Sequence, residues 1–239
     1  MGELRLSSRL LSQLGQAVGD GRGLFLYGPP GNGKTTVSER LVESFGETIW
    51  IPHTIIIDGE LVRLFDPRCH EPVPDAADAP GRADRRWVQI HRPTLVVGGE
   101  LTMDQLDLQF NQQTGICEAP VQMRANCGAL VVDDFGRQRM PVAELLNRLI
   151  VPMEKHVDFL NLASGRQVST PFEVLLVFST NLDPSELVDE AFLRRIPYKV
   201  EVGSPTEAEF VDLMLHLAGE LDCQCDPEAV DYLLQRHYR

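Results

Sequence analysis

Long apolar runs are missing from this 239-residue sequence, since none approaches the ~20 residues that a membrane-spanning helix needs. Its N-terminus also lacks the apolar core of a secretory signal peptide. Cysteine is scarce, and the five cysteines are odd in number and irregularly spaced, which indicates reduced thiols rather than disulfides. Cys223 and Cys225 have no second pair or nearby histidine that would complete a zinc site. The sequence therefore predicts a cytoplasmic protein without membrane insertion.

Basic residues are also in deficit. The chain holds 22 Lys and Arg against 35 Asp and Glu, a formal net charge of −13. Proteins that bind nucleic acid through its phosphates need a basic surface, so a nucleic-acid partner is the weaker expectation. One arginine cluster interrupts the acidic background, and we expect it to lie in a solvated loop. Its members are Arg82, Arg85, Arg86 and Arg92.

A glycine-rich segment matches the phosphate-binding pattern G-x-x-x-x-G-K-[ST], between an apolar run at 24–27 and a helical pattern at 36–45. Glycines let the backbone wrap around phosphate oxygens, so that its N–H groups point at the negative charge. Lys34 would reach the β- and γ-phosphates, and Thr35 would hold Mg²⁺. We therefore predict that a nucleoside triphosphate binds here. The predicted binding residues are Gly28, Pro29, Pro30, Gly31, Asn32, Gly33, Lys34, Thr35 and Thr36.

Polar residues follow two further apolar runs. Asp133 and Asp134 follow residues 129–132, and Asn181 follows the run at 174–179. Downstream of a phosphate loop, Asp133 is expected to contact Mg²⁺, directly or through water, and Asp134 to orient or deprotonate the attacking water. Asn181 would then lie beside both motifs and position water near the γ-phosphate. An ordinary turn is the alternative both for the two aspartates, where it would be solvated, and for Asn181.

Two adjacent arginines, Arg194 and Arg195, stand in the acidic segment 189–196. Pairing with local acids is one interpretation. The other is that one of them stabilises the charge that develops in phosphoryl transfer, an effect on the order of 10³–10⁵ in rate.

The apolar runs alternate with helical patterns, which predicts an α/β fold with a parallel β-sheet sandwiched by helices. Expected helices cover residues 5–19, 36–45, 142–150, 206–217 and 227–238, and expected strands cover 24–27, 49–58, 129–132, 174–179 and 200–202. Residues 66–84 are expected to form a surface excursion, and 86–97 a hairpin or extra strand pair. We expect residues 1–203 to form the nucleotide-binding domain and 204–239 to begin a helical lid.

The order GPPGNGKT, LVVDD, FSTN and DEAFLRR, over roughly residues 5–239, resembles that of AAA+ ATPases. The resemblance implies a P-loop NTPase that hydrolyses ATP with Mg²⁺ and self-associates into a ring or spiral, commonly a hexamer, to do mechanical work on another macromolecule. It further implies that Asn181 is sensor 1 and that Arg194 is an arginine finger acting on a neighbour's ATP, with Arg195 as its substitute. Residues 145–159 are similar to the MoxR-like and enhancer-activator branches.

Two features depart from the family pattern. The usual acidic motif ends in Asp-Glu, whereas this chain has Asp133-Asp134, as the replication-initiator branch also tolerates. The shorter carboxylate reaches the water less well, so slow hydrolysis or an ATP-dependent switch is an alternative to a motor. A sensor 2 arginine is also missing, because Arg236 and Arg239 come too early. We therefore expect either an abbreviated lid or a fragment of a longer protein.

An oligomeric ATPase that remodels a protein partner is the leading hypothesis. A nucleic-acid loader or initiator ATPase is the second, because the Asp-Asp pair fits it although the net charge does not. A small-molecule P-loop kinase is the third, and the paired arginines argue against it.

The part that contacts a substrate is the least defined. Trp87, beside Arg85, Arg86 and His91, is a candidate for a working loop, and a packed Trp on a hairpin is the alternative. Two arginines after the acidic pair, Arg137 and Arg139, would face a neighbouring subunit or ATP, or would pair with the two aspartates.

Overall fold

Five parallel strands form the central sheet of the protein. The structure, a computed structural model, describes residues 7–74, 84–223 and 225–237. The strands are β1 (Leu24–Tyr27), β6 (Thr94–Val97), β9 (Ala129–Val132), β12 (Leu175–Thr180) and β13 (Tyr198–Glu201). Their order is β13-β1-β12-β9-β6, with every neighbouring pair parallel. The carboxyl ends of β1, β9 and β12 therefore meet at one edge of the sheet.

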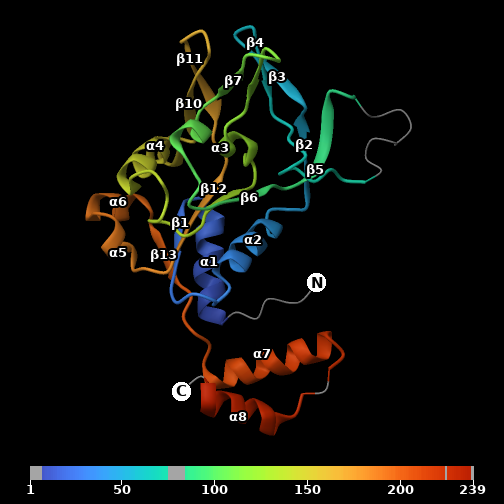
Figure 1. The fold of residues 1–239 in the computed structure, drawn as a ribbon, viewed down its shortest axis with the longest axis vertical. Helices are drawn as coiled ribbons and strands as arrows, with labels where there is room; N and C mark the ends of the chain where they lie inside the picture. Colours follow the sequence, from blue (N-terminus) through green and yellow to red (C-terminus); the bar gives the residue numbers. More distant parts are fainter. Residues whose placement is uncertain (1–6, 75–83, 224, 238–239) are drawn as a thin grey trace.

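Helices cover both faces of this sheet, because alternate residues of each strand point to opposite sides. On one face, α4 (Val142–Lys155) packs its buried leucines against the strands. The strand residues there are Phe25, Leu95, Leu130, Val132, Leu176 and Phe178. On the other face lie α1 (Ser8–Asp20) and α2 (Lys34–Glu43) (Figure 1). Their strand partners are Leu24, Leu26, Ala129, Val131, Leu175, Val177 and Val200. The predicted parallel sheet between helices is confirmed.

Three smaller β-structures lie outside the central sheet. β2 (Thr48–Pro52) pairs with β5 (Trp87–His91), and β10 (Val157–Asn161) forms a hairpin with β11 (Gln167–Pro171). The third is a four-stranded sheet in the order β3-β4-β8-β7. Its strands are β3 (Thr54–Ile57), β4 (Glu60–Arg63), β8 (Ile116–Glu118) and β7 (Gln109–Asn111). Figure 1 shows the β3–β4 and β10–β11 turns at the end of the molecule opposite α7 and α8.

Short helical segments connect these strands. They are the 3-10 helix η1 (Met103–Leu106), α3 (Val121–Arg124), α5 (Pro184–Leu187) and α6 (Glu190–Arg195).

The structure corrects two expectations about the β-rich region. Residues 86–97 are not a hairpin, because β5 pairs with β2 whereas β6 pairs with β9 in the central sheet. The run at 49–58 contains two strands, β2 and β3, and both lie outside that sheet. The described part of the expected excursion, residues 66–74, is mostly exposed, and Asp66 and His70 are its buried residues. Residues 75–83 lie outside the described part.

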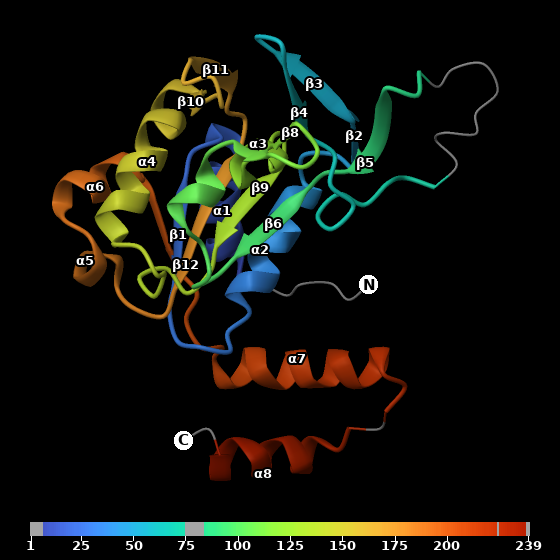
Figure 2. The same cartoon turned by 45° about the horizontal axis from the view of Figure 1, so that its top comes forward.

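After β13 the chain leaves the sheet and forms two helices, α7 (Glu207–Glu220) and α8 (Pro227–His237). Thr206 caps α7, and a capping box with Glu209 fixes where the helix begins. The two helices pack against each other, joined to the rest of the chain through residues 202–206 (Figure 2). The division into domains at residue 203 stays a prediction. Within the described residues, none of the helices has the length and apolarity that crossing a membrane requires.

Candidate nucleotide-binding site

The phosphate loop connects β1 to α2 in a backbone conformation that requires glycine. Gly28, Gly31 and Gly33 have φ angles of 139°, 83° and 76°, which side-chain-bearing residues rarely adopt. A Cβ at Gly28 would lie 2.4 Å from the carbonyl oxygen of Val202, so the space there is closed as well. Asn32 Nδ2 donates a hydrogen bond to the same oxygen over 3.2 Å. The loop is therefore held against the end of β13.

The other predicted loop residues lie at the surface. Pro29 and Pro30 are exposed, and Thr36 is exposed on the first turn of α2. The buried face of the loop instead carries the charged residue of the motif, Lys34, which is 8% exposed.

The ammonium group of Lys34 is turned into the loop. Its Nζ donates to the carbonyl oxygens of Gly28 and Pro29, each over 2.9 Å, and to Asn181 Oδ1 over 2.7 Å. These three contacts use all three donors of the ammonium group. Burial lowers the pKa of Lys34, and the negative charges of Asp133 and Asp134 oppose that shift. The loop thus holds one positive charge where phosphate oxygens would approach.

The register of two strands explains why Asn181 reaches Lys34. Tyr27 of β1 pairs with Thr180 of β12, so the residues that follow them, Gly28 and Asn181, leave the sheet as neighbours. Asn181 therefore lies beside the phosphate loop. This is the position that the resemblance implies for sensor 1.

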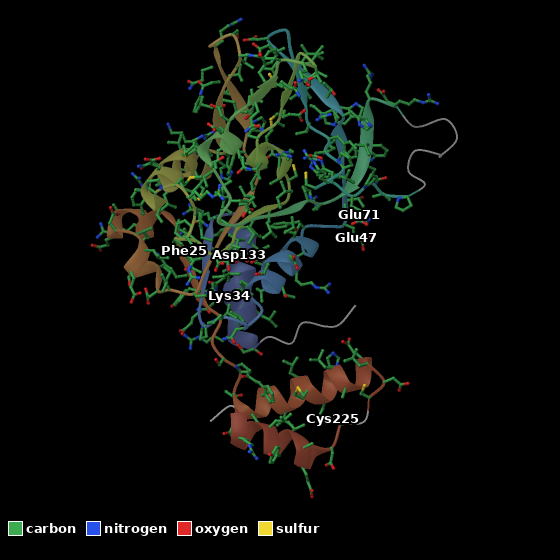
Figure 3. All side chains as sticks on the ribbon, viewed as in Figure 1. Phe25, Lys34, Glu47, Glu71, Asp133 and Cys225 are labelled. Atoms are coloured by element: carbon green, nitrogen blue, oxygen red, sulfur yellow. The ribbon has the colours of Figure 1, made fainter. Side chains whose placement is uncertain are left out.

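A hydroxyl and a carboxylate meet at the same edge of the sheet. Thr35 Oγ1 donates to Asp133 Oδ2 over 3.1 Å, and the backbone N–H of Asp133 donates to the carbonyl of Val97 on β6 over 2.8 Å. Figure 3 shows Lys34 and Asp133 together on the side of the sheet nearer to α7 and α8. Oxygen donors of this kind are what Mg²⁺ prefers, so Thr35 and Asp133 fit the metal that the phosphate loop implies.

Asp134 occupies a tight turn after β9. It is exposed, has a left-handed φ of 47°, and donates its backbone N–H to Asp133 Oδ1 over 3.0 Å. Gln138, which no sequence motif marks, bonds the backbone of this turn through its side chain. The sequence shows only that Gln138 is a polar residue five positions after Asp133. It does not show which groups Gln138 contacts.

The two adjacent arginines lie outside this site. On α6, Arg194 pairs with Glu190 over 2.6 Å and its side chain is 75% exposed. Arg195 pairs with Glu154 of α4 over 3.3 Å. Among the described residues, neither guanidinium contacts Lys34 or the two aspartates. The catalytic role expected for Arg194 or Arg195 stays a prediction.

The two arginines that follow Asp134 in the sequence are also not paired with the acidic motif. Arg137 and Arg139 are exposed, and within the described chain neither forms an ion pair with Asp133 or Asp134. Of the two alternatives for these arginines, pairing with the acidic motif is therefore not seen in this conformation, and facing a neighbouring subunit or ATP stays a prediction.

The aromatic candidate for a working loop lies on β5. Trp87 is 46% exposed, and Trp50 on the partner strand β2 is 49% exposed. The strand register places both on the same face of the ribbon, so Trp87 is not packed into a core. Beside it, Arg86 pairs with Asp84 over 2.6 Å. Arg82 lies outside the described residues, as does Arg239.

Solved structures share this architecture, although no family model matches the sequence and no curated protein is similar to it. A chain of the BchI–BchD complex of magnesium chelatase superposes with a TM-score of 0.56 at 21% identity, over 95% of this chain and 67% of that chain. NtrX from Brucella abortus in complex with ADP gives 0.55 at 15% identity, over 99% and 47%. A mutant of RuvB from Thermotoga maritima gives 0.56 at 14% identity, over 97% and 57%.

These three structures decide the fold. The chain has the fold of AAA+ ATPases. The resemblance noted in the motifs is therefore confirmed at the level of the AAA+ fold, and the identities do not distinguish a branch. This chain spans about half the length of the NtrX and RuvB chains.

Proposed function

We propose that this protein binds Mg-ATP and hydrolyses it as a subunit of an oligomeric AAA+ ATPase that remodels a protein partner. The observation that carries the proposal is the convergence at Lys34 and Thr35. Lys34 Nζ lies 2.7 Å from Asn181 Oδ1, and Thr35 Oγ1 lies 3.1 Å from Asp133 Oδ2. Three motifs far apart in the sequence thus meet at one point, which is the arrangement that phosphoryl transfer needs.

Each residue has a defined part in this chemistry. Lys34 binds the β- and γ-phosphates, exchanging its carbonyl partners for phosphate oxygens. Thr35 and Asp133 hold Mg²⁺, which when bound neutralises charge on the phosphate oxygens. Asp134 orients the attacking water and takes its proton, while Asn181 keeps that water in line. The water oxygen bonds to the γ-phosphorus, the bond to the bridging oxygen breaks, and ADP and phosphate are the products.

Adenine is the base we propose, because NtrX of the same fold has been solved with ADP and with ATP. The cysteines among the described residues are free thiols, which fits our proposal of a cytoplasmic location.

Assembly is proposed from the position of Arg194. The Arg194 side chain is 75% exposed on a short helix and, among the described residues, pairs with Glu190 rather than with the nucleotide site, so it is available to the ATP of a neighbouring subunit. We propose a ring or open spiral, with six subunits as the expected number. The magnesium chelatase structure, which is a complex between subunits, has the same fold.

Mixing two inactive variants tests this proposal. We expect Arg194→Ala to bind ATP normally and to lose about 10³-fold in turnover, and Lys34→Ala to lose nucleotide binding. In a mixture, an intact phosphate loop meets an intact arginine at some boundaries, so ATP hydrolysis should partly return. The matched control is Arg9→Ala, another exposed helical arginine. Full turnover of Arg194→Ala at high protein concentration would remove the trans role of this arginine.

A nucleic-acid loader or initiator remains the second candidate. The Asp133-Asp134 pair favours it, and RuvB of the same fold is described as a Holliday junction branch migration motor. Binding to single- and double-stranded DNA at two salt concentrations separates the two candidates, because phosphate contacts weaken steeply with salt. Salt-sensitive binding to DNA that also stimulates ATP hydrolysis would replace the protein partner in our proposal with a nucleic acid.

A slow ATP-dependent switch is the other alternative to a motor. It would show one turnover of ATP followed by retention of ADP.

A further inference from the structure

The side chain of Gln138 makes three hydrogen bonds to the backbone of the turn after β9. Its Nε2 donates to the carbonyl oxygens of Asp133 over 3.0 Å and Asp134 over 3.2 Å. Its Oε1 accepts the backbone N–H of Gly136 over 2.8 Å. Both N–H donors and the acceptor of the carboxamide are therefore used within residues 133–138.

The turn needs such a partner because its backbone is unusual. Asp134 has a φ of 47° and Gly136 a φ of 99°, and a non-glycine residue in the left-handed region costs on the order of 1 kcal/mol. β9 ends at Val132, so the carbonyl of Asp133 is beyond the last strand pairing of this segment. Gln138 supplies the hydrogen bond that the sheet no longer provides.

We propose that Gln138 is a positioning residue for ATP hydrolysis, which sets the orientation of the Asp133 and Asp134 carboxylates through the backbone of their turn. The inference rests on the proposed function. Asp133 links the turn to the phosphate loop, because its Oδ2 accepts from Thr35 and its Oδ1 accepts from the N–H of Asp134. A rotation of this turn therefore moves both carboxylates relative to the bound phosphates.

The left-handed turn matters more here than it would with a longer acid. Aspartate lacks one methylene of glutamate, so the Asp134 carboxylate cannot adjust its reach through an extra torsion. Its distance from the attacking water is then decided by the backbone at residue 134. Misplacement of a reacting group by about 1 Å costs about 10²-fold in rate.

Removing the hydrogen bonds while keeping the volume of Gln138 tests the inference. Gln138→Met is expected to lower kcat by about 10²-fold while the Kd for ATP changes by less than about 3-fold. The amide hydrogen of Gly136 should also exchange faster, because it loses its acceptor. The matched control, Gln112→Met, changes an exposed glutamine in the β7–β8 turn and should leave all three quantities unchanged.

A second variant keeps an acceptor at position 138 and removes the two donors. In Gln138→Glu, an ionised carboxylate would face the carbonyls of Asp133 and Asp134 and repel them. We expect this variant also to lower kcat by about 10²-fold while the Kd for ATP changes by less than about 3-fold.

The outcomes separate the two proposals. A wild type that hydrolyses ATP beside a Gln138→Met variant of equal kcat overturns this inference and leaves the proposed function standing. A wild type without turnover overturns both. Should Gln138→Met fail to fold, Gln138→Glu decides, and a kcat equal to that of wild type overturns the inference.

Discussion

Gly28 lies so close to Val202 that a Cβ at position 28 would be 2.4 Å from the Val202 carbonyl oxygen. The same carbonyl accepts a hydrogen bond from Asn32, and the N–H of Val202 donates to Tyr27 over 2.8 Å. Val202 is the first residue after β13 and starts the segment that leads to α7. The phosphate loop and the connection to the two C-terminal helices are thus in direct contact.

Gly28→Ala should destabilise the protein and weaken ATP binding together. The new methyl group collides with backbone, and the φ of 139° is unfavourable for alanine, so we expect a loss of about 2–4 kcal/mol in the free energy of unfolding. Gly203→Ala is the control, because no atom lies within 4 Å of its added Cβ. Urea unfolding and ATP titration of both variants measure the difference. Equal stability of the two would show that the loop can move away from Val202.

Asn181→Asp and Asn181→Ala should separate binding from turnover. A carboxylate at position 181 would form an ion pair with Lys34 and compete with phosphate for its charge, so we expect the Kd for ATP to rise about tenfold. Alanine removes only the polar group, so affinity should hold while kcat falls by about 10²-fold. Nucleotide titration and steady-state hydrolysis report the two effects. Equal affinity of the two variants for ATP would show that a carboxylate at position 181 does not compete with the phosphates for Lys34.

Stability should fall at acid pH through Asp66. Hydrogen bonds from the Arg68 side chain, aided by the charge of Arg124, lower the pKa of Asp66 to about 2. A lowered pKa in the folded state contributes stability above the unfolded pKa of about 4, and the contribution is lost as the pH falls towards 2. Asp66→Asn should therefore cost up to about 2 kcal/mol at pH 6, and its difference from wild type should shrink between pH 4 and pH 2.

The control for this measurement is Asp84→Asn. Asp84 also has a pKa of about 2, because of its hydrogen bonds with Arg86, but this pair is at the surface, where solvent screens the charges. The unfolding free energy of Asp84→Asn should therefore differ from that of wild type by less than the unfolding free energy of Asp66→Asn does at every pH above about 4. A pH-independent cost for Asp66→Asn would assign its effect to packing rather than to charge.

The motifs and most elements of the central sheet follow from sequence alone. The apolar runs at 24–27, 129–132 and 174–179 are strands because each is short, continuous and flanked by turn residues. The phosphate loop is recognisable because its glycines are needed locally, whatever surrounds them. Strands and loops of this kind depend mainly on residues that are close in the sequence, so they can be predicted from the sequence alone.

Membership in the central sheet was decided only by tertiary structure. β2 and β3 are as β-rich in sequence as β6, yet only β6 pairs with β9. Any of these strands satisfies the local preference, and the choice depends on which side chains can be buried together against β9 and α4. Pairing between distant strands leaves no periodic signal in a single sequence.

The same limit applies to the site. The sequence by itself determined which residue types are present, namely Lys34, Thr35, the two aspartates and Asn181. Tertiary structure decided that Asn181 contacts Lys34, 147 positions away in the sequence, and that Arg194 pairs with Glu190 outside the nucleotide site. It also decided that Gln138 hydrogen-bonds the backbone of the turn that carries the two aspartates. The reason is physical, because strand register and a left-handed backbone turn place these groups, and both arise from contacts between segments far apart in the chain.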